Sequence, residues 1–116
     1  MLFANGQLTS AAHPYSRILE LNMRTRKTVW EYRDPRVMNF SCGFISGAER
    51  LPNGNTFICE GGYGRFFEIT PKGETVWEYN NPYMGVSPLY GTEQNWVFRA
   101  HRYAASSPQI RRRVKQ

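Results

Sequence analysis

One stretch of this sequence occurs twice, and that repeat limits the fold more than any other feature. Residues 5–35 read NGQLTSAAHPYSRILELNMRTRKTVWEYRDP, and residues 53–82 read NGNTFICEGGYGRFFEITPKGETVWEYNNP. Asn5-Gly6 aligns with Asn53-Gly54 at a shift of 48 positions, and the later Trp-Glu-Tyr triplets align at a shift of 47. The one deletion falls in a turn, where a change of length is tolerated. Such repetition indicates an array of one supersecondary unit, in which each unit packs against its neighbour.

The second copy predicts four antiparallel strands, at residues 47–51, 56–60, 65–70 and 74–79. The sequences PNGN, GGYG and PKG separate these strands and are typical of turns, and Gly54 can adopt the positive φ of a hairpin turn. In the first copy, MLFA takes the place of the first strand and QLTSAA that of a weak second strand. After Pro82, the segment SPLYGTEQNWVFRAHRY predicts one or two strands of a third unit.

Four strands in each unit, repeated at this period, predict an all-β fold made of four-stranded antiparallel β-propeller blades. The 116 residues allow one domain, and ten glycines and seven prolines divide the chain into short segments. We expect a first blade at about 1–35, a second at about 44–82, a partial third at about 84–104 and a basic tail at 105–116. Because propellers close with about four to eight blades, we expect either a homo-oligomer that completes the ring or a longer parent chain.

The net charge of +6 comes mainly from the C-terminal end. Arg111, Arg112, Arg113 and Lys115 supply four positive charges, which leaves 11 basic and 9 acidic side chains in the other 110 residues. No aromatic or glycine pattern of an RNA-binding module accompanies the tail, so we expect a solvated terminus rather than a nucleic-acid partner. No window of eighteen apolar residues predicts a membrane span, and the first residues lack the features of a signal peptide.

Three segments together resemble the bacterial arylsulfotransferase-like proteins, over roughly residues 2–104. They are YSRILELNMRTRKTVWEYRDP, ISGAERLPNGNTFICEGGYGRFFEITPKGETVWEYNNP and NWVFRAHRYA. The resemblance implies a six-bladed β-propeller, of which this chain would be the last third. It also implies a chemistry, because active members move a sulfuryl group from one phenol to another through a transiently sulfated histidine. Members of the family are often exported.

Sulfuryl transfer needs a nucleophile, cations that hold the sulfate oxygens, and an acid for the leaving phenoxide. In active members a histidine commonly precedes the L-P-N-G-N turn, whereas Ser46 or Gly47 stands there in this chain. We therefore place the candidate catalytic site at His101, which Arg99 and Arg102 flank. In the strand expected there, Arg99 and His101 share one face and Arg102 points to the other.

Several other residues are interpreted as structural. His13 precedes a proline in an expected exposed turn, and Cys42 and Cys59 match no metal or redox spacing and are predicted to be small buried residues. Arg17 and Arg65 open the third strand of each copy, and we expect them to pair with Glu20 or Glu68 or with an acid of a neighbouring blade.

The remaining acids and aromatics follow the same reasoning. Glu31 and Glu78 recur in both copies and are interpreted as structural, whereas Glu60 aligns with Ala12 and could line a channel. No zinc-ligand spacing or phosphate-binding glycine loop is present, so neither a metal nor a cofactor is predicted. The aromatic set predicted to form core between blades is Phe57, Phe66, Phe67, Trp77 and Tyr79.

These observations leave three functional hypotheses. The first is a non-catalytic blade module that acts as a scaffold or ring-forming subunit. The second is an aryl sulfotransferase completed by oligomerisation, in which His101 attacks an aryl sulfate and Arg99 and Arg102 hold the sulfate. The third is a basic binding module that acts through the tail. The missing histidine and the missing blades favour the first hypothesis.

Overall fold

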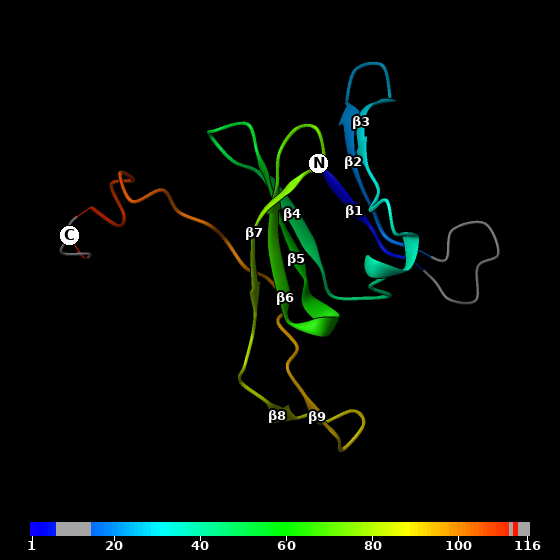
Figure 1. The fold of residues 1–116 in the computed structure, drawn as a ribbon, viewed down its shortest axis with the longest axis vertical. Helices are drawn as coiled ribbons and strands as arrows, with labels where there is room; N and C mark the ends of the chain where they lie inside the picture. The colour runs from blue at the N-terminus through cyan, green and yellow to red at the C-terminus, as the bar shows by residue number, and fades with distance from the viewer. Residues whose placement is uncertain (7–14, 112, 114–116) are drawn as a thin grey trace.

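The protein, described by a computed structural model over residues 1–6, 15–111 and 113, consists of three antiparallel β-sheets (Figure 1). No α-helix occurs in these residues, which confirms the all-β prediction, and none of their helical turns could span a membrane. Two 3-10 turns, Val37–Asn39 and Gly61–Tyr63, lie between strands. The first sheet contains β1 (Leu2–Ala4), β2 (Arg17–Asn22) and β3 (Lys27–Tyr32); the second contains β4 (Gly47–Arg50), β5 (Thr56–Glu60), β6 (Arg65–Ile69) and β7 (Thr75–Asn80); the third contains β8 (Gly85–Val86) and β9 (Glu93–Gln94).

The second sheet is the four-stranded unit that the repeat predicts, with its strands in the order β4-β5-β6-β7. Gly54 has the expected positive φ of 86° in the turn between β4 and β5. The pairing of β6 with β7 shifts between Glu68 and Ile69, and the pairing of β2 with β3 shifts between Glu20 and Leu21. The same irregularity at equivalent positions confirms that the two copies fold in the same way over these strands.

The first sheet corrects the predicted alignment of the chain's first residues. β1 pairs directly with β2, so that Ala4 lies opposite Arg17, as Glu60 lies opposite Arg65 in the second sheet. MLFA therefore holds the place of a second strand, and Asn5-Gly6 is not the counterpart of Asn53-Gly54. Residues 7–14, which include QLTSAA, Ala12 and His13, lie outside the described residues.

The two larger sheets pack face to face. Each sheet has a tryptophan face, which carries the Trp-Glu-Tyr aromatics, and an arginine face, which carries Arg17 or Arg65, because cross-strand partners share a face. The tryptophan face of the first sheet packs on the arginine face of the second, and the indole of Trp30 donates a 3.1 Å hydrogen bond to the Pro71 carbonyl. The core between the sheets consists of Ile18, Tyr32, Phe40, Ile58, Phe67 and Ile69.

The tryptophan face of the second sheet is only partly covered. Of the aromatics predicted to be core, Phe57 on this face and Phe67 on the arginine face are buried and Phe66 is half-buried. Trp77 and Tyr79 are 38% and 42% exposed, so the prediction is wrong for them. Tyr32, which holds the same position in the first sheet as Tyr79 in the second, is only 4% exposed. The difference arises because the second sheet covers Tyr32, whereas no four-stranded sheet of the described residues covers Tyr79.

In the segment expected to form a third unit, β8 and β9 form a two-stranded hairpin below the second sheet in Figure 1. Beyond it, residues 95–104 run back along the second sheet without forming a strand, contrary to the strand expected there. Contacts with the Gly61–Tyr63 turn hold the start of this segment in place. The Val97 amide donates to the Gly61 carbonyl at 3.0 Å, and the Asn95 side chain donates to the Tyr63 carbonyl at 3.0 Å.

Candidate functional site

His101 lies against the first strand of the second sheet. Its Nδ1 is 2.9 Å from a carboxylate oxygen of Glu49 in β4, and the other oxygen of Glu49 accepts a 2.8 Å hydrogen bond from the Arg102 amide. One carboxylate thus holds both the ring and the backbone beside it. The side chain of His101 is 45% exposed, and its Nε2 makes no hydrogen bond with the parts of the chain that the structure describes. Nothing in the sequence had singled out Glu49.

Arg102 is occupied by contacts with the second sheet. Its guanidinium makes an ion pair with Glu68 in β6 and lies over the Trp77 ring, 4.7 Å from the ring centroid. Although burial alone would raise the pKa of Glu68, the amides of Asn55 and Asn53 and the Arg102 guanidinium hold it below its ordinary value. Glu68 is therefore a charged partner for Arg102, and its carboxylate binds the Nη1 donor that could otherwise bind a sulfate oxygen.

The Arg102 contact repeats one made by Arg50. Arg50, in β4, pairs with Glu20 at 2.5 Å and lies over the Trp30 ring, 4.5 Å from its centroid. Glu20 and Trp30 hold the same positions in the first sheet as Glu68 and Trp77 in the second. An arginine from each following unit therefore bridges a glutamate and a tryptophan of the preceding sheet, and we call this arrangement the arginine bridge.

A weaker sequence repeat underlies the arginine bridge. Residues 44–51 read FISGAERL and residues 96–103 read WVFRAHRY, at a shift of 52 positions. Ala48 and Arg50 align with Ala100 and Arg102, and His101 takes the place of Glu49. This second repeat is visible in the sequence, but only two of its eight positions are identical.

The three predicted site residues are therefore only partly brought together. His101 and Arg102 both contact Glu49 through different atoms, while the Arg102 side chain turns to Glu68. Arg99 is exposed and lines a shallow hollow with Ala48 and His101. Among the described residues Arg99 has no ion-pair partner.

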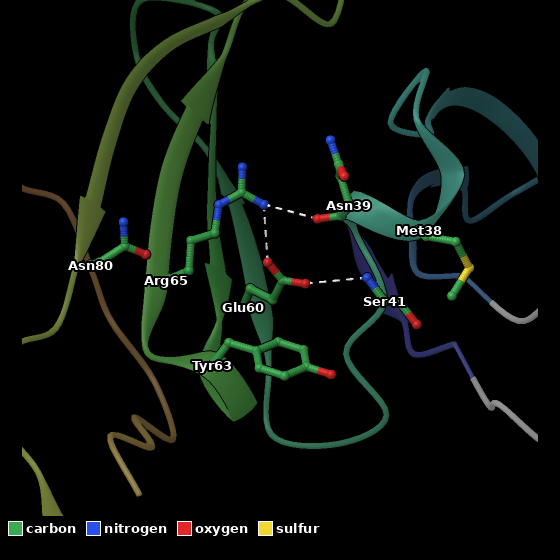
Figure 2. A pocket seen from close by; sticks show the side chains of 7 residues that line it. All are labelled: Met38, Asn39, Ser41, Glu60, Tyr63, Arg65 and Asn80. Atoms are coloured by element: carbon green, nitrogen blue, oxygen red, sulfur yellow. Dashed lines mark hydrogen bonds and ion pairs between the residues drawn. The ribbon is translucent and has the colours of Figure 1, made fainter.

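A second hollow, of about 290 Å³, lies between the Gly61–Tyr63 turn and the linker that joins the two large sheets (Figure 2). Glu60 lies at its base with only 3% of its side chain exposed. One carboxylate oxygen accepts from the Ser41 amide at 3.2 Å and the other from Arg65 at 3.1 Å. Met38, Tyr63 and Asn80 line the remaining walls. Burial raises the pKa of Glu60 above its ordinary value, against the opposing effect of Arg65.

The contacts of Arg65 indicate that this hollow is a structural joint. Its guanidinium bridges Glu60 and Glu78, both at 3.1 Å, and also donates to the Asn39 carbonyl at 3.1 Å. Every one of these partners belongs to the second sheet or to the linker, so the arginine fixes the linker against the sheet. Of the groups that line the space beside it, Asn39, Ser41, Glu60 and Arg65 are already joined by hydrogen bonds.

The sequence suggested Glu20 and Glu68 as partners of Arg17 and Arg65, but neither pair forms. Arg17 instead pairs with Glu31 at 3.6 Å, just as Arg65 pairs with Glu78. This finding supports the structural interpretation of both glutamates.

The cysteines agree with their prediction. Cys42 and Cys59 are free thiols, each 1% exposed, and burial raises the pKa of Cys59 to about 11. Within residues 1–6, 15–111 and 113, no group of three or more histidine, cysteine or acidic side chains could hold a metal ion. His13 and the tail residues Arg112 and Lys115 lie outside those ranges.

Comparison with known proteins adds no further assignment. No family model, no curated protein and no solved structure matches this chain.

Proposed function

We propose that this chain is a non-catalytic module of a β-propeller, in which each full sheet is one blade and the open sheet faces receive further blades. The observation that carries the proposal is the arginine bridge. Arg50 and Arg102 make the same contact with two successive sheets, so Arg102 acts in packing one unit on the next. Arg102, which the sequence suggests as a ligand of the sulfate, therefore has the same packing role as Arg50.

The electrostatics of the site support the same conclusion. Binding of a sulfate ester requires guanidinium or ammonium donors that point at its oxygens. The imidazole of His101 contacts the carboxylate of Glu49, and the guanidinium of Arg102 makes its ion pair with Glu68. Arg99, which lines the same hollow, is the one arginine of the predicted site without an ion-pair partner among the described residues, so a single free guanidinium faces two carboxylates there.

A sulfuryl-transfer assay tests this proposal. The purified chain, at low and high concentration, would be mixed with 4-nitrophenyl sulfate and a phenolic acceptor while release of nitrophenolate is followed. We expect no release above the buffer rate. Release that disappears in both His101→Ala and His101→Gln would contradict the proposal, because histidine-dependent turnover is incompatible with a non-catalytic module.

One observation favours aryl sulfotransfer as a second candidate. Glu49 holds Nδ1 of His101 and would leave the Nε2 lone pair pointing to solvent, as a nucleophilic imidazole requires. In that reaction Nε2 attacks sulfur and the bond from sulfur to the phenol oxygen breaks, so the phenoxide leaves and takes a proton from solvent. The acceptor phenol then attacks the same sulfur, the sulfur–nitrogen bond breaks, and the acceptor proton is released.

The matched variant for this candidate is Glu49→Gln. A transferase would lose most of its turnover in both His101→Ala and Glu49→Gln, since the carboxylate orients the ring through Nδ1. Equal turnover in the parent and both variants would show that nitrophenolate release does not arise at this histidine.

A further inference from the structure

The first sheet lacks one strand that the second sheet has. In the second sheet β4 pairs with β5 along its outer edge, with Ala48 opposite Ile58. The equivalent of β5 is β1, which lies at the edge of the first sheet, and among the described residues no strand pairs with its other side. The edge of β1 therefore offers unpaired backbone groups to an incoming strand.

The counterpart of that missing strand lies at the other end of the chain. Residues 99–102 align with β4, and they lie on the tryptophan face of the second sheet through Glu49 and the arginine bridge. β4 contacts the first sheet through the same bridge. The segment thus occupies the place of the first strand of a following blade, but it forms no ladder with any described strand.

We propose that residues 99–102 of one copy pair with β1 of a second copy, so that each shared blade contains one strand from the first copy and three from the second. This proposal rests on the proposed function as a blade module and names its partner. The pairing of β4 with β5 gives the expected register: Arg99 opposite Phe3, Ala100 opposite Leu2, and His101 opposite Met1.

The two faces that would meet are chemically matched. On the second sheet the exposed part of the tryptophan face is Trp77 and Tyr79. On the first sheet the arginine face presents Leu2, which is 52% exposed, and the half-buried Leu19. Leu2 and Leu19 hold the positions of Ile58 and Phe67, which form the core against the first sheet within one chain.

The number of strands also agrees with a closed assembly. Each chain supplies seven strands in its two large sheets and one unpaired segment at 99–102, which together make two four-stranded blades. The contact is head-to-tail, so the faces at the ends are covered only when the ring closes. Two, three or four copies would give four, six or eight blades, which is the range that propellers use.

A cysteine pair tests the register directly. We would introduce Leu2→Cys and Ala100→Cys into the same chain, since directly opposed residues of antiparallel strands lie about 4.5–5.5 Å apart at Cα, within disulfide range. Within one chain Leu2 lies on the face of the first sheet that points away from the second sheet, whereas Ala100 lies beside β4 of the second sheet, so we expect the disulfide to join copies. We expect oxidation to give covalent oligomers of at most four chains on a non-reducing gel, and little higher polymer.

Two controls separate this result from random oxidation. The first is the parent chain, whose Cys42 and Cys59 are buried and should stay unreacted. The second pairs Ala100→Cys with Val86→Cys, because Val86 is 70% exposed on β8 and has no place in the proposed interface. Both controls should remain without cross-links at the same protein concentration.

Light scattering provides a measurement that does not depend on cysteine. We expect a mass of two to four times 13.5 kDa for the parent chain. Tyr79→Glu, which places a charge on the open face, should give a monomer with unchanged far-ultraviolet circular dichroism. A monomeric parent at every concentration overturns the proposal, as does an oligomer in which the designed pair cross-links no better than the control pair.

These outcomes can be told apart from failure of the proposed function. Histidine-dependent sulfuryl transfer by a cross-linked ring would overturn the non-catalytic role and leave the ring intact. An inactive monomer would overturn the shared blade and leave the blade-module assignment in place.

Discussion

The Gly61→Ala substitution tests how the second unit is joined to the segments around it. A Cβ built on Gly61 would lie 2.1 Å from the Val97 carbonyl oxygen and 2.4 Å from that of Ile45. Both are backbone atoms, and they belong to the segments that lead into 99–102 and into β4. The chain can accept the methyl group only if at least one of these segments moves.

The expected cost follows from the contacts that such a movement breaks. Overpacking at a close backbone approach costs about 1–3 kcal/mol. Displacement of Val97 also breaks its amide hydrogen bond to Gly61, and a lost hydrogen bond adds about 1 kcal/mol. We therefore expect Gly61→Ala to lower the free energy of unfolding by about 2–4 kcal/mol, as measured by urea denaturation.

The matched control is Gly85→Ala, because no atom lies within 4 Å of a Cβ built at that position. Its free energy of unfolding should stay within about 0.5 kcal/mol of the parent. Trypsin should also cut Gly61→Ala faster after Arg99 and Arg102, since the segment that carries them would be released from the sheet. A Gly61→Ala chain as stable and as resistant to trypsin as Gly85→Ala would refute this account of the close approach.

Two further substitutions test the core and the buried acid. Tyr32→Ala should lower the free energy of unfolding by about 3–5 kcal/mol, because the ring is 4% exposed, whereas Tyr32→Phe should cost less than about 1.5 kcal/mol, since it removes only a weak contact with Asp34. Equal losses in urea denaturation would contradict the packing role. Burial raises the folded-state pKa of Glu60, so its carboxyl binds a proton more tightly in the folded chain, and the parent should gain stability relative to Glu60→Gln as the pH falls from about 7 to about 4. A difference that does not change with pH in urea denaturation would show that the burial of this carboxyl does not affect folding.

The strands of the second sheet were predictable because local chemistry and periodicity agree there. The strand at 56–60 has the predicted bounds, and the other three differ by one residue at one or both ends. Turn signals such as Asn53-Gly54 have a steric basis that neighbouring units do not alter. Burial of Trp77 was not predictable in this way, because it depends on whether another sheet covers its face.

The alignment predicted for the start of the chain is wrong because it depends on a match of residue types, whereas the equivalence of two strands depends on their hydrogen-bonded partners. Asn5-Gly6 and Asn53-Gly54 are the same dipeptide, but strand partners decide equivalence, and Ala4 opposite Arg17 sets β1 in the place of β5. Backbone pairing is a long-range property, and short matches of turn residues do not report it.

The partners predicted for Arg17 and Arg65 were wrong, although residue spacing in the sequence already excludes them. Arg17 and Glu20 are three residues apart, so on a strand they lie on opposite faces and cannot meet. Glu31 lies on the neighbouring strand opposite Leu19 and therefore on the same face as Arg17. The same reasoning applies to Arg65 and Glu78, which explains why both copies keep the arginine and the glutamate together.

The contact between Glu49 and His101 joins equivalent positions of two successive units, because His101 takes the place of Glu49 in the weaker repeat. Identical acids at both positions would place two carboxylates within hydrogen-bonding distance, which is unfavourable. The two units must therefore differ at this position even though their arginine bridges are the same. In a head-to-tail ring the first strands would alternate between Glu49 and His101, so each carboxylate would have an imidazole neighbour on either side. Under the proposed function, the histidine that first suggested sulfuryl transfer is a packing residue, which contacts Glu49 of the preceding unit.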